Sequence, residues 1–283
     1  MTKAPDLRVR TATGLLLIVG ASLLVYLGGG GPWPATGAGI GGWAFRIIVA
    51  LIAAGMLLEW NAMHGVDRAT SRGSALLLAP MLLFLAEVQF PVSHIRAPLT
   101  ADSFAAAQSP LALIAAAGVL LAVGSRYPSL GLGFVYVAVP AFALLVVEWG
   151  WERLTFWVMV VTWATDICAY FAGRTIGGPK LAPRISPNKT WAGLVGGIVG
   201  AAVLGWISAF LLSLGGIFLL LGGPMAALAQ AGDLFESWIK RRAGVKDSGA
   251  ILPGHGGLLD RLDGLLPVLV ATLALLMAGY WVK

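Results

Sequence analysis

Charged residues are scarce in this chain of 283 residues. They make up 11% of it and hydrophobic residues make up 58%, whereas an ordinary soluble domain has about 25% charged residues. So little polar surface cannot cover a water-facing globule, which argues against a soluble nucleotide-binding or barrel enzyme, a coiled coil and a disordered chain. The composition predicts an all-α, polytopic integral membrane protein that is largely embedded in lipid.

Two further absences narrow the class of protein to which the chain could belong. The single cysteine, Cys168, cannot form an intramolecular disulfide, so it says little about the redox compartment. A Walker A motif and a kinase glycine-rich loop are both missing from the sequence, so no known soluble nucleotide-binding domain is attached. The net charge of +6 would suggest nucleic acid in a soluble protein. In a membrane protein the distribution of the charges matters more, and we expect no nucleic-acid partner.

Nine apolar runs of a length suited to crossing a bilayer follow one another along the chain. They lie near Thr11–Gly31, Trp43–Trp60, Ser74–Phe90, Gln108–Gly124, Leu130–Val147, Leu154–Gly173, Trp191–Ser213, Gly216–Trp238 and Leu262–Val282. We expect Pro110 to interrupt the fourth run and Pro224 to interrupt the eighth. The sequence therefore predicts about nine transmembrane helices.

The basic residues predict the orientation of these spans. With a cytoplasmic N-terminus, 15 of the 19 Lys and Arg residues fall on the cytoplasmic side, as the positive-inside rule requires. Lys3, Arg8 and Arg10 before the first run also resemble a signal peptide, but eight spans follow and we expect an uncleaved anchor. We predict a cytoplasmic N-terminus, a periplasmic C-terminus and a multi-pass location in a bacterial-type inner (cytoplasmic) membrane.

The uneven distribution of polar residues predicts two regions. Residues 1–153 are expected to form a scaffold of lipid-facing helices. Residues 154–283 are expected to form a catalytic transmembrane region with cytoplasmic loops at 174–190 and 239–261. Both of the densely charged stretches of the chain lie in this second region.

The first charged stretch begins inside the sixth predicted span. Asp166, Tyr170 and Arg174 recur at intervals of four residues, so a helix would carry them on roughly one face. An ionisable group at membrane depth is a candidate functional residue, although a structural Asp166 satisfied by Tyr170 is an open alternative. Beyond it, Ser186 and Lys189 precede the start of a span, where hydroxyls and helix N-termini bind phosphate well.

The second charged stretch, residues 232–267, holds five of the 13 acidic residues. These are Asp233, Glu236, Asp247, Asp260 and Asp263. Asp233, either Glu236 or Ser237, and Lys240 share one helical face, and Asp260 and Asp263 are three residues apart at the start of the last span. Clustered carboxylates repel one another unless cations neutralise them, and hard oxygen ligands beside bases suit Mg²⁺ that also contacts substrate phosphates. The alternative is a solvated loop with interhelical ion pairs.

A glycine-rich segment, Gly254-His255-Gly256-Gly257, lies between the two acidic parts of this stretch. Glycines allow a backbone to approach a phosphate closely, and His255 adds a hydrogen-bond donor. Mg²⁺, an array of Lys and Arg, and a site at the membrane surface together point to phosphoryl or nucleotidyl transfer.

At these residues the sequence resembles the phosphatidate cytidylyltransferase (CDP-diacylglycerol synthase) family. The family signature is filled by Ser237, Lys240, Arg241, Lys246, Asp247, Ser248, Gly249, Leu252, Pro253, Gly254, His255, Gly256, Gly257, Asp260, Arg261 and Asp263. The upstream stretch is similar to the family from Asp166 to Trp191, with departures at Gly178, Asn188 and Ala192. The missing Glu at position 192 puts in doubt a carboxylate that would orient this loop.

This resemblance implies an enzyme that converts CTP and phosphatidic acid into CDP-diacylglycerol and pyrophosphate in the bilayer. It implies a homodimer and a two-metal centre with Mg²⁺ and a second cation, with Asp233, Asp260 and the candidate Asp263 as ligands. The remaining site residues are then expected to be catalytic (Lys240, Arg241, Lys246, Asp247, His255 and Arg261) or substrate-binding (Asp166, Tyr170, Arg174, Ser186, Lys189 and Ser237).

Two rival functions can be weighed against this one. A CDP-alcohol phosphotransferase would carry an Asp-Gly-x-x-Ala-Arg motif, which the sequence lacks; a polyprenyl-phosphate sugar transferase belongs to the same rival class. A transporter that uses Asp166 as an ion site would carry repeat symmetry and charges near the midplane. Here the charges gather on one predicted side of the membrane.

Overall fold

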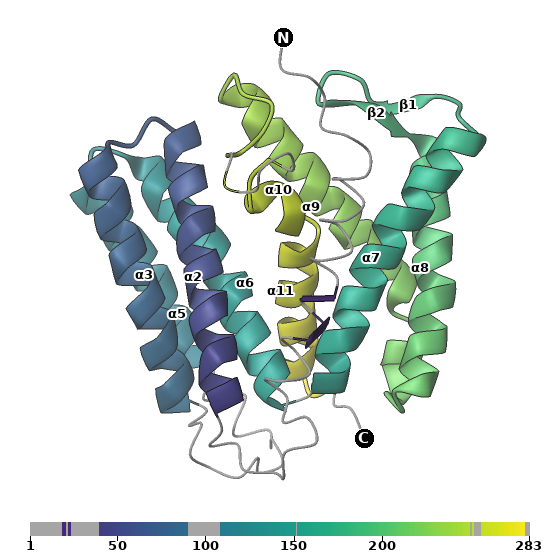
Figure 1. The fold of residues 1–283 in the computed structure, drawn as a ribbon, viewed down its shortest axis with the longest axis horizontal. Coiled ribbons are helices and arrows are strands. Elements are labelled where there is room, and N and C mark those ends of the chain that lie inside the picture. The colour runs from purple at the N-terminus through teal and green to yellow at the C-terminus, as the bar shows by residue number, and fades with distance from the viewer. Residues whose placement is uncertain are drawn as a thin grey trace. The chain divides into compact units, whose positions relative to one another are not determined.

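The computed structural model describes residues 19–20, 22–23, 40–89, 108–150, 152–249, 251 and 256–280, and most of these residues are helical. The chain divides into two compact units (Figure 1). Unit 1 comprises Met1–Glu152 and Asp247–Asp260, and unit 2 comprises Arg153–Lys246 and Arg261–Lys283. The segment 247–260, which carries much of the second charged stretch, therefore belongs with the N-terminal helices.

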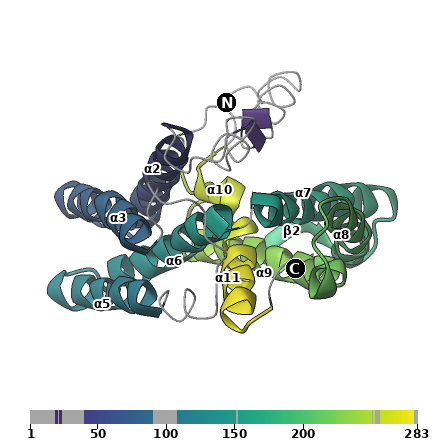
Figure 2. The ribbon, with the colours of Figure 1, turned by 90° about the horizontal axis from the view of Figure 1, so that it is seen from below.

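The described part of unit 1 contains four long helices. They are α2 (Ile40–Met63), α3 (Arg68–Gln89), α5 (Gln108–Gly124) and α6 (Pro128–Gly150). The carboxylate of Asp67 caps α3 by accepting hydrogen bonds from the backbone N–H groups of Ala69 and Thr70. Seen end-on in Figure 2, α6 lies beside both α2 and α5. Gly133 of α6 allows the close approach to α2, because a side chain there would collide with the Trp60 ring of α2.

Unit 2 contains helices α7 (Glu152–Thr175), α8 (Trp191–Leu211), α9 (Gly222–Arg242) and α11 (Leu265–Met277), with the short η1 (Gly216–Leu219) before α9. The short helix α10 (Leu259–Leu262) spans the boundary between the units. Small residues line the contact between α7 and α8: Gly196 lies against Ala172, and Gly200 lies against Cys168. Such residues let membrane helices approach closely, which accounts for part of the high glycine content.

A β-hairpin departs from the all-helical prediction. Strands β1 (Lys180–Ala182) and β2 (Ser186–Thr190) pair in antiparallel register between α7 and α8, where only a loop was expected. Its register pairs Lys180 with Thr190 and Ala182 with Ser186. The prolines lie before β1, in the turn and near the start of β2, where they remove few ladder hydrogen bonds.

Five of the described helices are long and apolar enough to cross a membrane: α2, α3, α6, α7 and α8. Helices α5 and α11 are apolar but shorter, with 17 and 13 residues. The first predicted span lies outside the described residues except for 19–20 and 22–23. A mostly helical protein with several possible membrane spans is therefore confirmed, whereas the number nine stays a prediction.

Three expected helix features were wrong. Pro110 and Pro224 do not interrupt helices, because each lies in the first turn of its helix, where no hydrogen-bonded N–H is needed. The last apolar run does not begin as one helix at Leu262. A turn at Asp263 and Gly264 separates α10 from α11, so Asp260 and Asp263 do not lie on one continuous helix.

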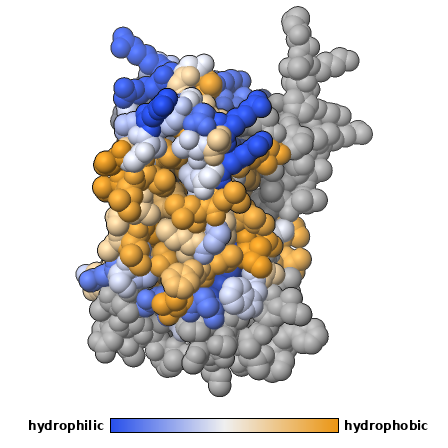
Figure 3. Space-filling model, turned by 90° about the vertical axis from the view of Figure 1, so that its left-hand side faces the viewer, coloured by the Kyte–Doolittle hydropathy of each residue, from blue (hydrophilic) through white to orange (hydrophobic). Residues whose placement is uncertain are grey.

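An exposed apolar surface covers one face of unit 1. Figure 3 shows a continuous apolar band between two polar ends on the face formed by this unit. Exposed residues of α3 and α5 contribute to such a surface, namely Leu76, Leu77, Phe84, Val88, Val119, Leu120 and Val123. A soluble protein rarely exposes an apolar area this large, whereas contact with lipid requires it.

Candidate functional site

A cavity of about 590 Å³ lies within unit 2, between α7, β2, α8 and α9. Its lining comprises Asp166, Ala169, Tyr170, Gly173, Arg174, Asn188, Lys189, Thr190, Gly193, Leu194, Gln230 and Asp233. Five of the predicted site residues are thus brought to one place: Asp166, Tyr170, Arg174, Lys189 and Asp233. A cavity that joins acids and bases with aromatic and apolar walls suits an anionic substrate with an apolar part.

Local structure explains how Lys189 comes to this cavity. The hydroxyl of Thr190 accepts a hydrogen bond from the Gly193 N–H at 3.0 Å, which starts α8 directly after the hairpin. The Trp191 N–H donates to the Pro179 carbonyl at 3.1 Å and closes the base of the hairpin. Lys189 is therefore fixed one residue before the capped end of a helix.

An ion pair joins the two sides of the cavity. Lys189 Nζ lies 2.7 Å from Asp233 Oδ2 and donates to Gln230 Oε1 at 3.3 Å. The Ser237 hydroxyl, one helical turn after Asp233, donates to Asp233 Oδ1 at 3.3 Å. Gln230 was missed by the sequence analysis, although its position three residues before Asp233 on the same helix could have indicated it.

The basic end of α9 makes contacts within the protein. Lys240 Nζ lies 3.2 Å from Glu236 Oε2, and both residues are buried. The Arg241 guanidinium donates to the backbone carbonyls of Ile185 and Val245, at 3.3 and 2.9 Å. Arg241 thereby ties the hairpin turn to the end of α9, and its predicted contact with a triphosphate stays a prediction.

The remaining basic and catalytic candidates lie on different elements: Arg261 is in α10, Ser186 is in β2, and Lys246 and Asp247 follow α9. Lys246, Asp247 and Arg261 are exposed, and Ser186 pairs with Ala182 at the start of β2. His255 and Gly254 lie outside the described residues. The structure thus leaves the roles assigned to these residues untested.

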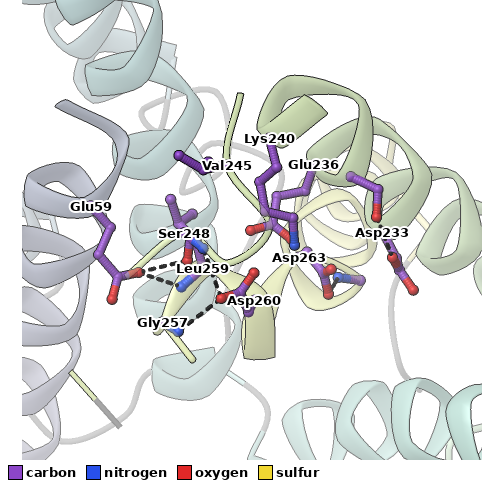
Figure 4. Close-up of polar contacts among 12 residues, drawn as sticks. Glu59, Asp233, Glu236, Lys240, Val245, Ser248, Gly257, Leu259, Asp260 and Asp263 are labelled. Carbon is purple, nitrogen blue, oxygen red and sulfur yellow. Dashed lines mark hydrogen bonds and ion pairs between the residues drawn. The ribbon is translucent and has the colours of Figure 1, made fainter. Parts of the chain in front are cut away.

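Asp260 of unit 1 is held by backbone amides. Its Oδ2 accepts hydrogen bonds from the Ser248 N–H at 2.9 Å and the Gly257 N–H at 2.8 Å (Figure 4). Gly256 has a φ of +80°, and a Cβ there would come within 2.7 Å of the same oxygen. The positive φ and the lack of space for a Cβ both require glycine at position 256. The sequence had suggested a different reason, which is the close approach of a phosphate to the backbone.

Asp263 of unit 2 lies in the turn between α10 and α11. Burial raises the pKa of its carboxyl well above the ordinary value, and the negative charges of Asp233 and Glu236 raise it further. Carboxyl groups that disfavour one another's ionisation are suited to a cation, so the chemistry of Asp233 and Asp263 fits Mg²⁺. Among the described residues, however, no three histidine, cysteine, aspartate or glutamate side chains are grouped to hold a metal ion.

One acidic residue of unit 1 was missed altogether. Glu59 of α2 is buried and accepts hydrogen bonds from the 247–260 segment. Its presence at the end of the second predicted span was a signal, because ionisable groups in membrane segments are rarely without a role.

Comparison with known proteins identifies the family. The profile of the Cytidylyltransferase family matches residues 8–278, which is nearly the whole chain. The chain belongs to this family. The resemblance found in the signature residues is thereby confirmed.

Several bacterial members of the family are similar to this chain. The phosphatidate cytidylyltransferase of Brucella suis biovar 1 (strain 1330) is 38% identical over 241 residues, which cover 80% of this chain and 82% of the relative. The protein of that name from Brucella melitensis biotype 1 shows the same identity and coverage. That of Pseudomonas aeruginosa is 41% identical over 165 residues, covering 56% of this chain and 60% of the relative.

Proposed function

We propose that this protein is a phosphatidate cytidylyltransferase, which makes CDP-diacylglycerol and pyrophosphate from CTP and phosphatidic acid. The observation that carries the proposal is the similarity, over most of the chain, to bacterial proteins of that name. The mixed acidic and basic cavity of unit 2 supports it. The apolar helices support a location in a membrane, where phosphatidic acid resides.

The reaction needs two anions to meet, and the protein's basic residues serve that need. An oxygen of the lipid phosphate attacks the α-phosphorus of CTP, a new P–O bond forms, and the bond to the bridging oxygen of the β-phosphate breaks. Pyrophosphate leaves with the electron pair. A phosphate monoester is largely ionised at neutral pH because its second pKa is near 6, so no strong general base is required.

The proposed site residues are divided between the two substrates. Lys189 and Arg174 line the cavity beside α7, a helix long enough to span the membrane, and are assigned to the phosphate of the lipid. Ser186 is assigned to the same phosphate. Lys240, Arg241, Lys246 and Arg261, with Asp247 and His255, are assigned to the triphosphate and the leaving group.

Asp233, Asp260 and Asp263 are the proposed ligands of Mg²⁺ and of a second cation. When bound, Mg²⁺ supplies neutralisation of the phosphate charges that would otherwise repel the attacking lipid phosphate. The carboxyl groups themselves contribute fixed oxygen donors, one of which, Asp260, is already oriented by two amides. Asp233 is oriented by Ser237 and paired with Lys189.

A radiochemical assay with two labelling positions tests the function. Purified protein with phosphatidic acid, Mg²⁺ and CTP labelled at the α-phosphate should transfer the label to the lipid fraction. CTP labelled at the γ-phosphate is the matched control, and its label should remain in water-soluble pyrophosphate. Chelation of divalent cations should abolish the transfer. Lipid labelling from the γ-position, or none from the α-position, would contradict the proposed reaction.

The proposed topology is nine spans with a cytoplasmic N-terminus and a periplasmic C-terminus, in the inner membrane. Two cysteines at opposite ends of α8 test it in a Cys168→Ser background. Lys180→Cys lies in the exposed hairpin, and Gly215→Cys lies beyond the other end, where no atom crowds the new side chain. The helix between them has 21 residues and is about 31 Å long.

An impermeant thiol reagent should label Gly215→Cys in intact cells and Lys180→Cys only after the cells are opened. The reverse pattern, or labelling of both from the same side, would overturn this topology and the access of the cavity to cytosolic CTP. The homodimer implied by the family resemblance is tested separately by light scattering of the detergent-solubilised protein, which should give twice the mass of the chain.

A further inference from the structure

Glu59 lies near the C-terminal end of α2 and is only 4% exposed. Its carboxylate accepts three hydrogen bonds from one segment that is distant in sequence. Oε1 accepts from the Leu258 N–H at 2.9 Å, and Oε2 accepts from the Leu259 N–H at 2.9 Å and the Ser248 hydroxyl at 3.1 Å (Figure 4). A carboxylate is the side chain suited to this set, because it only accepts and has two oxygens.

The residues that donate these three hydrogen bonds are the same as, or adjacent to, the residues that hold Asp260. Ser248 donates its hydroxyl to Glu59 and its backbone N–H to Asp260 Oδ2. Gly257, which donates its N–H to the same oxygen of Asp260, immediately precedes Leu258. Glu59 therefore holds both backbone stretches that orient the Asp260 carboxylate.

The fit around Glu59 supplies a second, independent observation. A Cβ on Gly249 would come within 2.5 Å of Glu59 Oε1, and Gly257 is crowded by the Ser248 hydroxyl and Glu59. One turn earlier on α2, Gly55 leaves room for Leu258, since a Cβ there would lie 2.7 Å from Leu258 Cδ1. The segment is thus docked on α2 by shape as well as by hydrogen bonds.

We propose that Glu59 is a positioning residue, which holds residues 247–249 and 256–260 against α2 and thereby fixes the Asp260 carboxylate for catalysis. The catalytic part of this inference rests on the proposed cytidylyltransferase function. The positioning part concerns the conformation of the segment, so it can be tested without any assay of activity.

Amide hydrogen exchange measures the positioning directly. In Glu59→Gln the side-chain amide presents a donor where a backbone N–H also donates, so at least one of the Leu258 and Leu259 amides loses its partner. Exchange in residues 256–260 should become about tenfold faster or more, as expected for loss of a hydrogen bond to a charged group. Glu59→Asp, which keeps the charge on a shorter side chain, should give an intermediate rate.

Activity should fall in the same variants in which amide exchange becomes faster. We expect kcat to fall by about tenfold or more in Glu59→Gln, with the KM values of both substrates changed less than threefold, because the misplaced group acts on the reaction rather than on substrate affinity. Glu59→Asp should recover part of kcat. Gly55→Val should displace Leu258 and produce the same two changes while the carboxylate stays intact.

Glu87→Gln is the matched control. Glu87 is another acidic residue of unit 1 and forms an ion pair at 2.7 Å with Arg46, which lies toward the opposite end of α2 from Glu59. This variant should leave the exchange of residues 256–260 unchanged. Unchanged exchange in both Glu59→Gln and Gly55→Val, each purified as a monodisperse protein, would overturn the proposal. If the wild-type protein fails the cytidylyl assay, the exchange result still decides whether Glu59 positions the segment.

Discussion

Asp260 in unit 1 and Asp233 in unit 2 are both proposed metal ligands, yet the protein holds them in different ways. Two backbone amides hold Asp260 Oδ2. A flexible lysine side chain, that of Lys189, holds Asp233 Oδ2, and the hydroxyl of Ser237 donates to Oδ1. The first arrangement is part of the folded backbone, whereas the second depends on side chains that can change their partners.

The hydrogen bonds that hold Asp260 are also stronger than the ion pair that holds Asp233. A hydrogen bond to a charged group contributes about 1.5–3 kcal/mol, so the amides of Ser248 and Gly257 fix Asp260 firmly. The side chains of Lys189 and Asp233 are 19% and 34% exposed, and ion pairs with access to solvent contribute about 0.2–1 kcal/mol. We infer that Asp260 is prepared before substrate arrives, and that Lys189 can leave Asp233 for a substrate phosphate when a cation takes its place.

The largest effect should follow from removing the charge of the fixed carboxylate. Asp260→Asn keeps the shape of the side chain and should lower cytidylyl transfer by at least about 100-fold, beyond the 10- to 100-fold typical of residues that only support metal ligands. The purified variant should elute as wild type does. Near-normal turnover of Asp260→Asn at saturating Mg²⁺ would remove Asp260 from the list of ligands.

The next largest effect concerns Lys189, the partner of Asp233, and distinguishes the binding of phosphatidic acid from the binding of CTP. Lys189→Ala should raise the KM for phosphatidic acid more than that for CTP, and Lys246→Ala should do the reverse. A lost charge-assisted hydrogen bond of about 1.5–3 kcal/mol corresponds to about 10- to 150-fold in the affected constant. Calorimetric binding of CTP should accompany the kinetics, since KM equals a dissociation constant only when chemistry is slow. Equal effects on both substrates would indicate one shared polyphosphate site.

Features that depend on residues close together in the chain were easier to predict from the sequence than features that depend on distant contacts. The apolar runs predicted most helices well, and one run, Gln108–Gly124, has the same bounds as α5. The four-residue spacing of Asp166, Tyr170 and Arg174 correctly placed them on one face, because a helix alone determines it. The hairpin at 180–190 was missed because its strands are short and no hydrophobic periodicity indicates that they pair.

Glu59 illustrates what local patterns leave out. Its three partners are 189 to 200 residues away in the chain, so no spacing could connect them. The turn at Asp263 was missed for a related reason. The chain passes so close to α9 there that a Cβ on Gly232 would lie 2.5 Å from the Asp263 carbonyl oxygen, a contact that only the folded structure contains.

A smaller effect should separate two neighbouring arginines in unit 2. Arg241 donates to the carbonyls of Ile185 and Val245, whereas the guanidinium of Arg242 lies over the Trp238 ring. Arg241→Ala should loosen the hairpin, and loss of this support alone should lower activity about fivefold, which corresponds to about 1 kcal/mol. Arg242→Ala, the matched control, should stay within twofold of wild type. Limited proteolysis at the hairpin should follow the same order, and equal protection in both variants would contradict the role given to Arg241.

The smallest predicted effect tests whether Lys189 competes with a cation for Asp233. Lys189→Met keeps the length and apolar stem of the side chain and removes its charge, so Asp233 loses its internal counter-ion. An ion pair of about 0.2–1 kcal/mol corresponds to about 1.4- to fivefold in an equilibrium constant. The half-saturating Mg²⁺ concentration, measured with both substrates in excess, should therefore fall by about that factor even though turnover is reduced. Ser248→Ala alters the support of Asp260 instead and leaves the Lys189–Asp233 pair in place, so it should not lower this concentration. If Lys189→Met raises the Mg²⁺ requirement, Lys189 assists the cation and does not compete with it, and the exchange of partners inferred for Asp233 is wrong.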